Sequence, residues 1–146
     1  MAYTTRDLVK QYLGIPDGTS SENTPIDNAV LAAQSEIDQI TGRTFEVPGS
    51  ATVKTFVPYD DFTLYIDDIA QKTGLIVKTD TGLDGTYDTT LTITTDFVLE
   101  GNTAPYRVVK RVDGSAYPRD RYGRPTVQVT AFWGYEMAIP DQIKQC

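Results

Sequence analysis

The chain has 146 residues, 40% of them hydrophobic and 23% charged, so it is long enough and apolar enough to fold as one domain around its own core. It contains no histidine and a single cysteine, Cys146, which excludes a disulfide framework, a cysteine-based zinc site and most hydrolase active sites. A net charge of −7 and an isoelectric point of about 4.4 argue against an autonomous nucleic-acid-binding protein, which would carry a basic surface.

A first helix is predicted to begin at Thr4 or Thr5 and to end at Gly14. The threonine hydroxyls offer an N-terminal cap, and Asp7 follows in the first turn. Apolar residues recur on one helical face at Leu8, Val9, Tyr12 and Leu13. Residues 17–24 are small and polar, which predicts a surface loop after this helix.

The second helix has the clearest sequence signal. Thr24 is expected to cap it, Pro25 occupies the first helical position, and Gly42 follows the last turn. Its apolar residues form one narrow stripe, made of Ile26, Val30, Ala33, Ile37 and Ile40. Such a stripe packs on another helix. A place in the core of the subunit is favoured, and an interface between subunits is the alternative.

From about residue 51 the composition changes to alternating threonine, valine, isoleucine and aromatic residues, which is typical of strands. Six strands are predicted, over residues 52–57, 63–66, 75–79, 90–94, 106–109 and 126–132. Turn residues separate them, so we expect a mostly antiparallel sheet or a small barrel.

Near the end of the chain, Ile139, Pro140 and Asp141 predict the start of a third helix. The predicted fold class is therefore α+β, in which two N-terminal helices and a C-terminal helix frame a mostly antiparallel β-rich insertion. Residues 1–146 would form a single domain, helical over 1–45 and 136–146 and β-rich over about 51–134.

The positive charges are concentrated in one segment. Between residues 107 and 124 lie six basic and two acidic residues, a balance of +4 in a chain whose net charge is −7. A basic segment on an acidic body can contact other copies of the chain or an acidic partner. A solvated loop is the equally weighted alternative. Three arginines of the segment are candidates for such a contact: Arg119, Arg121 and Arg124.

One acidic loop is a weak candidate for a calcium site. Asp80, Asp84 and Asp88 surround turn glycines, as ligands do in calcium-binding loops. The pattern departs from an EF-hand, because Gly82 replaces the second ligand and Leu91 replaces the bidentate glutamate. A hairpin tip that uses aspartate and glycine for its turn is favoured, so no metal is expected.

Two acidic pairs, Asp60–Asp61 and Asp67–Asp68, flank a predicted strand. A metal site or an acid–base pair is conceivable at either pair. Turn chemistry explains both pairs more simply, and it is favoured.

Several functional classes find no support in the sequence. Neither a Walker glycine loop nor a dinucleotide-binding glycine pattern occurs. No run of about 20 apolar residues that could span a membrane is present, and the polar N-terminus lacks an apolar signal region. We therefore expect a soluble cytoplasmic protein that is not an enzyme, needs no cofactor and binds no membrane.

Aromatic residues cluster after the last predicted strand, at Phe132, Trp133 and Tyr135. Aromatic side chains dominate the energetics of protein interfaces, which makes Trp133 and Tyr135 candidate interface anchors. Packing in the core is the alternative.

Four stretches of the chain, taken together, resemble one known family. They are DLVKQYLGI at 7–15, AAQSEIDQITGRTF at 32–45, LYIDDI at 64–69 with GTY at 85–87, and VTAFWGY at 129–135 with IPDQIK at 139–144. In this order they resemble the head-tail connector, or head-to-tail adaptor, proteins of tailed bacteriophages. Each motif alone is weak, and the order of all four carries the resemblance.

The resemblance implies a structural protein of the virion. Members of this family form an oligomeric ring of about twelve copies beneath the portal, which joins head to tail and lets DNA pass without specific binding. The implied partners are further copies of the chain, the portal protein and the next connector or tail-completion protein. The implied location is the head-tail junction, with the host cytoplasm during assembly, and no catalysis is implied.

Two other functions remain as alternatives. The first is a β-rich binding module, carbohydrate- or calcium-dependent, of a phage tail or a cell-surface protein. The second is a carboxylate enzyme, which needs paired acids with displaced pKa values in a pocket. The connector interpretation predicts that the three arginines, with Trp133 and Tyr135, lie at a ring or portal interface.

Overall fold

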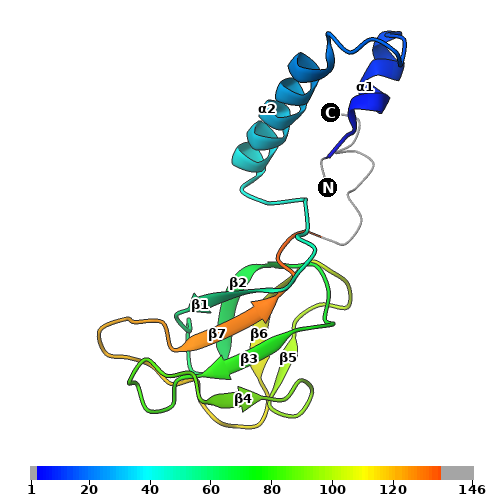
Figure 1. Ribbon diagram of the computed structural model, residues 1–146. Coiled ribbons are helices and arrows are strands. Elements are labelled where there is room, and N and C mark those ends of the chain that lie inside the picture. The colour runs from blue at the N-terminus through cyan, green and yellow to red at the C-terminus, as the bar shows by residue number, and fades with distance from the viewer. Residues whose placement is uncertain (1–2, 136–146) are drawn as a thin grey trace.

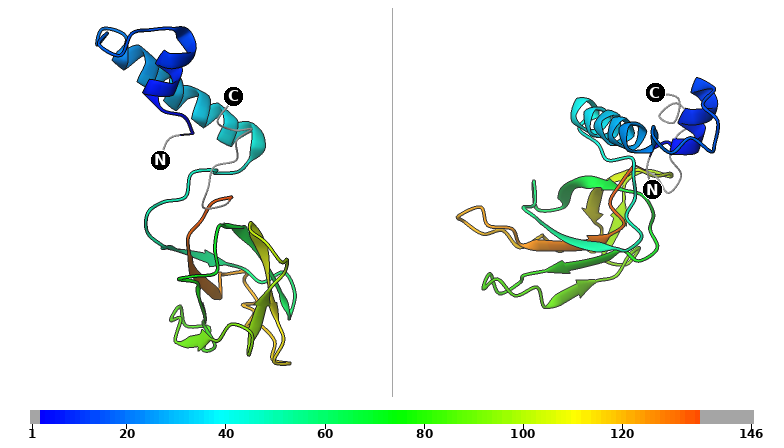
Figure 2. Two further views of the ribbon diagram at one scale, coloured as in Figure 1. Left: turned by 90° about the vertical axis from the view of Figure 1, so that its right-hand side faces the viewer. Right: turned by 45° about the horizontal axis from the view of Figure 1, so that its top comes forward.

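The computed structural model describes residues 3–135. It has two parts, a helical hairpin and a β-sandwich, which are joined by a narrow neck (Figure 1). The hairpin comprises α1 (Arg6–Leu13) and α2 (Asn23–Thr41). It stands away from the sandwich in all three ribbon views (Figures 1 and 2). The subunit is therefore elongated, with different elements exposed at its two ends.

Helix α1 begins and ends as its sequence predicts. The Thr5 hydroxyl accepts a hydrogen bond from the Leu8 backbone N–H at 3.3 Å, which satisfies one of the free donors of the first turn. Gly14 follows the helix with φ 68°, a left-handed conformation that glycine adopts without strain.

Helix α2 begins two residues earlier than the capping pattern predicts, at Asn23 instead of Pro25. Its N-cap is Glu22, whose side chain makes no capping hydrogen bond, and Thr24 already lies inside the first turn. The predicted cap at Thr24 is therefore wrong, whereas the end at Gly42 is confirmed by its left-handed φ of 62°. Within residues 3–135, neither helix has the length and hydrophobicity needed to cross a membrane.

The sandwich consists of two antiparallel sheets. In the first sheet the strand order is β1-β7-β3-β4, with bounds Thr52–Phe56, Val127–Ala131, Ile76–Thr79 and Thr89–Leu91. In the second sheet the order is β2-β6-β5, with bounds Thr63–Ile69, Tyr106–Arg111 and Phe97–Leu99. Each of the six predicted strand segments overlaps one of these strands, and β5 was not predicted.

The core of the protein lies in the sandwich. Alternate residues of β7, namely Val127, Val129 and Ala131, are fully buried, and Leu64 of β2 is fully buried as well. Burial of each such aliphatic side chain stabilises the fold by about 1.5–3 kcal/mol. The buried cluster that these residues belong to contains strand and loop residues and no residue of α1 or α2. The sandwich therefore has a core that does not depend on the hairpin.

The predicted α+β fold class is wrong. The described chain is a β-sandwich preceded by two helices of 8 and 19 residues, and it is not a helical frame that carries a β-rich insertion. The physical reason is that the two sheets cover each other's apolar faces, so no helix is needed to close the core. The predicted C-terminal helix, over residues 136–146, lies outside the described residues.

Candidate functional site

Two segments cross in the neck between the hairpin and the sandwich. Residues 42–51 lead from α2 to β1, and residues 132–135 leave β7. The Tyr135 backbone N–H donates to the Thr44 carbonyl at 3.0 Å, and the Gly134 N–H donates to the Asp68 carbonyl at 2.8 Å. The two segments are thus tied to each other and to β2.

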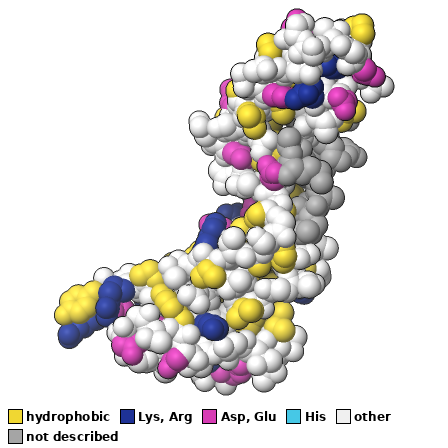
Figure 3. Space-filling model, in the orientation of Figure 1, with side chains coloured by type: hydrophobic (Ala, Val, Ile, Leu, Met, Phe, Trp, Pro, Cys, Tyr) yellow, Lys and Arg dark blue, Asp and Glu magenta, His cyan; other side chains and the backbone are white. Residues whose placement is uncertain are grey.

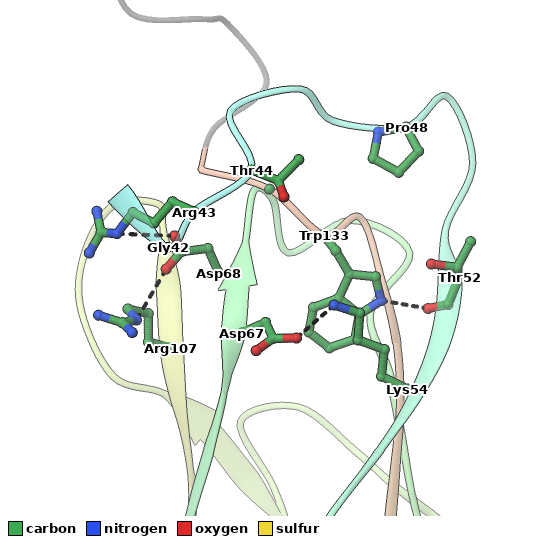
Figure 4. A pocket seen from close by; sticks show the side chains of 11 residues that line it. Gly42, Arg43, Thr44, Pro48, Thr52, Lys54, Asp67, Asp68, Arg107 and Trp133 are labelled. Atoms are coloured by element: carbon green, nitrogen blue, oxygen red, sulfur yellow. Dashed lines mark hydrogen bonds and ion pairs between the residues drawn. The ribbon is translucent and has the colours of Figure 1, made fainter. Parts of the chain in front are cut away.

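A polar cavity of about 390 Å³, here called the neck pocket, opens beside this crossing (Figure 4). Its wall comes from both crossing segments and from strands β1, β2 and β6. Five charged side chains line it: Arg43, Lys54, Asp67, Asp68 and Arg107. This concentration of charged side chains makes it the first place to look for a ligand.

Asp68 is the buried centre of the neck pocket. Only 8% of its side chain is exposed, and one of its carboxylate oxygens, Oδ1, accepts no hydrogen bond from residues 3–135. Two guanidinium groups provide the charge that a buried carboxylate needs: Arg43 Nε lies 3.5 Å from Oδ2, and Arg107 Nε lies 3.1 Å from Oδ1. Figure 4 shows the two arginines on the same side of Asp68, Arg43 above Arg107, each joined to the carboxylate by a dashed line.

In the other half of the pocket the charges are paired with each other. Lys54 Nζ lies 2.6 Å from Asp67 Oδ2 and 4.8 Å from the centroid of the Trp133 ring. The Trp133 indole N–H donates to the Thr52 carbonyl at 2.8 Å, and its ring packs against Phe56. Only 6% of Trp133 is exposed, so it offers no open face on which a sugar ring could stack.

Tyr135, the other aromatic candidate, also lies in the neck. Its ring packs against Phe45 with centroids 5.2 Å apart, and the Arg43 guanidinium lies 5.0 Å from its centroid. Phe45 in turn meets the edge of Tyr3. The structure therefore brings Trp133 and Tyr135 together in the neck, where their neighbours belong to the same chain.

The three candidate arginines lie together in a loop between β6 and β7, here called the tip loop (residues 112–126), which projects from the sandwich (Figure 1). Arg119 lies 3.6 Å from Asp61, and Arg124 lies 2.5 Å from Asp120. The backbone N–H of Tyr122 and the Arg124 guanidinium hold the pKa of Asp120 below its ordinary value. More than half of the Arg119 and Arg124 side chains is nevertheless exposed, which leaves them accessible to a partner.

The end of the tip loop combines charge with an exposed aromatic ring. Arg121 lies 4.8 Å from the centroid of the Tyr122 ring, and 74% of Tyr122 is exposed. Figure 3 shows hydrophobic and basic side chains gathered at this end of the molecule. An exposed aromatic ring beside arginines is typical of an interface hot spot.

The three aspartates of the calcium candidate accept hydrogen bonds from residues close to them in the chain. The Asp80 carboxylate accepts the backbone N–H groups of Asp84 at 3.2 Å and Gly85 at 2.8 Å. Asp84 accepts the Thr86 N–H, which lowers the pKa of Asp84, and Asp88 contacts the hydroxyl of Thr89. Within residues 3–135 no three acidic, histidine or cysteine side chains are grouped to hold a metal ion. These contacts are those of a hairpin tip.

The acidic pairs differ in their roles. Asp60 accepts the backbone N–H groups of Phe62 and Thr63, as turn chemistry predicts. Asp67 and Asp68 lie within β2, so the turn interpretation is wrong for them. A pair of carboxylates inside a strand, with one of them buried, was the one sequence signal that could have pointed to the neck pocket.

A second cavity, of about 350 Å³ and here called the hairpin groove, runs between the two helices. Its lining is almost entirely apolar and includes Val9, Ile26, Ala29, Val30, Ala33 and Ile37. Of the apolar residues in the two described helices, only Ile26 is buried. The stripe on α2, for which a place in the core was favoured, is therefore only partly covered by residues 3–135: Val30 and Ile37 are half-buried, and Ala33 and Ile40 are exposed.

Polar contacts hold the hairpin together. Arg6 donates to both carboxylate oxygens of Asp27, which joins α1 to α2 and lowers the pKa of Asp27. Lys10 is 3% exposed, and its ammonium donates to the Thr19 carbonyl at 2.6 Å. These contacts fix the shape of the hairpin without covering its apolar groove.

No protein family, curated protein or solved structure matches this chain.

Proposed function

We propose that this chain is a structural subunit of a bacteriophage head-tail connector, which forms an oligomeric ring beneath the portal, joins head to tail and lets DNA pass. The sequence resemblance suggests the connector, and the open hairpin groove is the observation that supports assembly. In this proposal the groove is covered by a second copy of the chain.

The groove needs a cover for energetic reasons. An isolated helix shorter than about 12 residues is marginal in water, and α1 has only 8 residues. Packing of an apolar face usually provides the missing stability, yet Leu13, which lines the groove, is 58% exposed. Elsewhere on the two helices, Leu8, Leu31 and Ile40 are each more than half exposed. An apolar surface of this kind marks an interaction site. Assembly would bury it and stabilise the hairpin.

The distribution of charge favours contact between unlike ends of neighbouring copies. Residues 3–46, which contain the hairpin, carry seven acidic and three basic side chains, whereas residues 118–125 of the tip loop carry three arginines and one aspartate. These two regions lie at opposite ends of the elongated subunit (Figure 1). Complementary faces at opposite ends produce a head-to-tail interface, and such an interface closes into a ring when the rotation between subunits allows it.

The acidic character of the chain also suits a passage for DNA. Phosphate groups bind chiefly to lysine and arginine, and a protein of net charge −7 attracts them weakly. A ring of such subunits would therefore let DNA move through without holding it.

The β-rich binding module is less well supported. A carbohydrate site in the neck pocket would need an exposed aromatic face there, and Trp133 is covered by Lys54 and Phe56. A calcium site in the acidic loop would have to compete with the backbone hydrogen bonds of Asp80 and Asp84. No observation on the described residues favours this function over the connector.

Negative-stain imaging and light scattering of the purified protein, alone and mixed with its portal protein, test the proposal. A ring in either sample is the expected result. A monomer in both samples, with no association with the portal, would refute the connector function.

A further inference from the structure

The two arginines of the neck pocket come from different parts of the chain and meet at one carboxylate. Arg43 belongs to the segment that follows α2, and Arg107 belongs to β6. Each contacts Asp68 through Nε, at 3.5 Å and 3.1 Å. In Figure 4 the terminal nitrogens of both guanidinium groups point away from Asp68 and toward the same side. Two sets of hydrogen-bond donors are thus presented next to each other.

These terminal nitrogens have no acceptor among residues 3–135. Arg43 contacts Asp68 through Nε and places the face of its guanidinium group over the Tyr135 ring, and Arg107 contacts Asp68 through Nε. About a third of the Arg43 side chain and more than half of the Arg107 side chain are exposed, so both are reachable from solvent. A guanidinium group pairs with an oxyanion through two parallel N–H donors, and here two such groups are available.

The charge of the cluster identifies the kind of ligand. Arg43, Arg107 and Asp68 together carry a net charge of +1, and Lys54 and Asp67 neutralise each other. One monoanionic group would balance the cluster, giving two guanidinium groups and two carboxylates. A phosphate dianion would add a second negative charge beside the buried Asp68, which is unfavourable at short range.

We propose that the neck pocket is a docking site for a carboxylate side chain of a partner protein, which is bound by the terminal nitrogens of Arg43 and Arg107. Asp68 is a positioning residue: it holds the two Nε atoms and turns both guanidinium groups outward. This site is independent of the hairpin groove, so it does not rest on the connector function.

Acetate is the probe that tests the site, because it carries the carboxylate alone. Nitrogen-15 NMR would follow the Nε–H signals of the arginines and the indole signal of Trp133, the single tryptophan of the chain, while acetate replaces chloride at constant ionic strength. Saturable shifts of the Arg43 and Arg107 signals are expected. Inorganic phosphate forms the second arm, and it is expected to bind more weakly than acetate.

Two variants sharpen the test. Arg107→Lys keeps the positive charge beside Asp68 but removes the planar fork, so acetate binding should weaken about tenfold, the lower end of what a hydrogen bond to a charged group contributes. Lys110→Gln is the control, because Lys110 lies on the same strand and pairs with Glu100 outside the pocket. An unchanged Trp133 indole signal shows that the neck of each variant is folded. If the Trp133 signal shows that the neck of Arg107→Lys is not folded, Arg43→Lys is measured in its place.

Three results would overturn the proposal. The first is the absence of saturable shifts with acetate, which would mean that Arg43 and Arg107 serve only to neutralise the buried Asp68. The second is equal acetate binding by the wild type and the folded arginine-to-lysine variant. The third is tighter binding of phosphate than of acetate, which would reject the carboxylate as the ligand.

Discussion

Gly134 passes so close to Val47 that a Cβ atom on the glycine would lie 2.6 Å from Val47 Cγ2. Real Cβ atoms do not approach other atoms so closely, so the two segments of the neck can cross in this way only because residue 134 has no side chain. The hairpin is attached to the sandwich through this crossing.

Gly134→Ala should therefore strain the neck and lower the free energy of unfolding by about 1–3 kcal/mol, as overpacking does elsewhere. Urea denaturation followed by Trp133 fluorescence measures the change. Gly49→Ala is the matched control in the same neck segment, because a Cβ atom there would meet nothing within 4 Å. Equal stability of the two variants would show that the crossing is not tight.

Leu64→Ala should destabilise the whole protein, because Leu64 is fully buried between the sheets. Loss of a buried leucine side chain costs about 2–5 kcal/mol. Val53→Ala, on an edge strand and 55% exposed, should have a far smaller effect. A small loss of stability for Leu64→Ala, measured by urea denaturation, would mean that the core lies elsewhere.

Asp113 should contribute stability that depends on pH. It pairs with Arg111, whose side chain is only 7% exposed, at 2.5 Å. This guanidinium holds the pKa of Asp113 far below its ordinary value of 3.8. The pKa is depressed in the folded state, so the contribution is complete above the ordinary value and is lost as the pH falls through the folded-state value.

The prediction is that Asp113→Asn lowers the urea midpoint at pH 7 and that the difference from the wild type shrinks below about pH 4, where the carboxyl group of the unfolded chain becomes protonated. Asp17→Asn, in a surface loop, provides the comparison. A difference that stays constant between pH 7 and the acid limit would contradict the role of the ion pair.

Replacing Arg119, Arg121 and Arg124 together by glutamate should prevent ring or portal assembly and leave the fold of the subunit intact, since all three residues are exposed in the tip loop. The control replaces three lysines elsewhere on the sandwich, Lys72, Lys78 and Lys110, and produces the same change in net charge. Electron microscopy of the assembled particles gives the result. Normal assembly of the tip-loop variant would exclude the tip loop as a contact.

The strands could be predicted because alternation of apolar and polar residues reflects burial of one face, as the pattern of β7 shows. The short β5 (Phe97–Leu99) was not predicted, since three residues are too few to establish a period. The helical frame was predicted wrongly for a different reason. An apolar stripe on α2 indicates that the helix has a partner, but it does not say whether the partner belongs to the same chain.

The neck pocket could not be predicted, because its residues are distant in sequence. Arg43, Asp68 and Arg107 come together only through tertiary structure. The antiparallel pairing of Ile69 with Tyr106 places Asp68 beside Arg107, and the chain leaving α2 brings Arg43 to them. No spacing between residues in the sequence indicates that these three side chains lie together. The hairpin groove, by contrast, uses the residues of the predicted stripe, and only its exposure was unforeseen.

One matched pair of variants tests whether a second copy of the chain covers the hairpin groove. Ala33 lines the groove and Ala32, its neighbour in α2, does not, although both are exposed. The masses of the wild type, Ala33→Glu and Ala32→Glu would be measured by light scattering, alone and with the portal protein.

If a second copy covers the groove, the wild type and Ala32→Glu assemble and Ala33→Glu stays monomeric, because a glutamate buried without a partner is strongly unfavourable. Equal masses for the two variants would contradict it. A monomeric wild type would also contradict it if the Ala33→Glu variant had a lower helix content than the wild type. Another part of the same chain would then cover the groove.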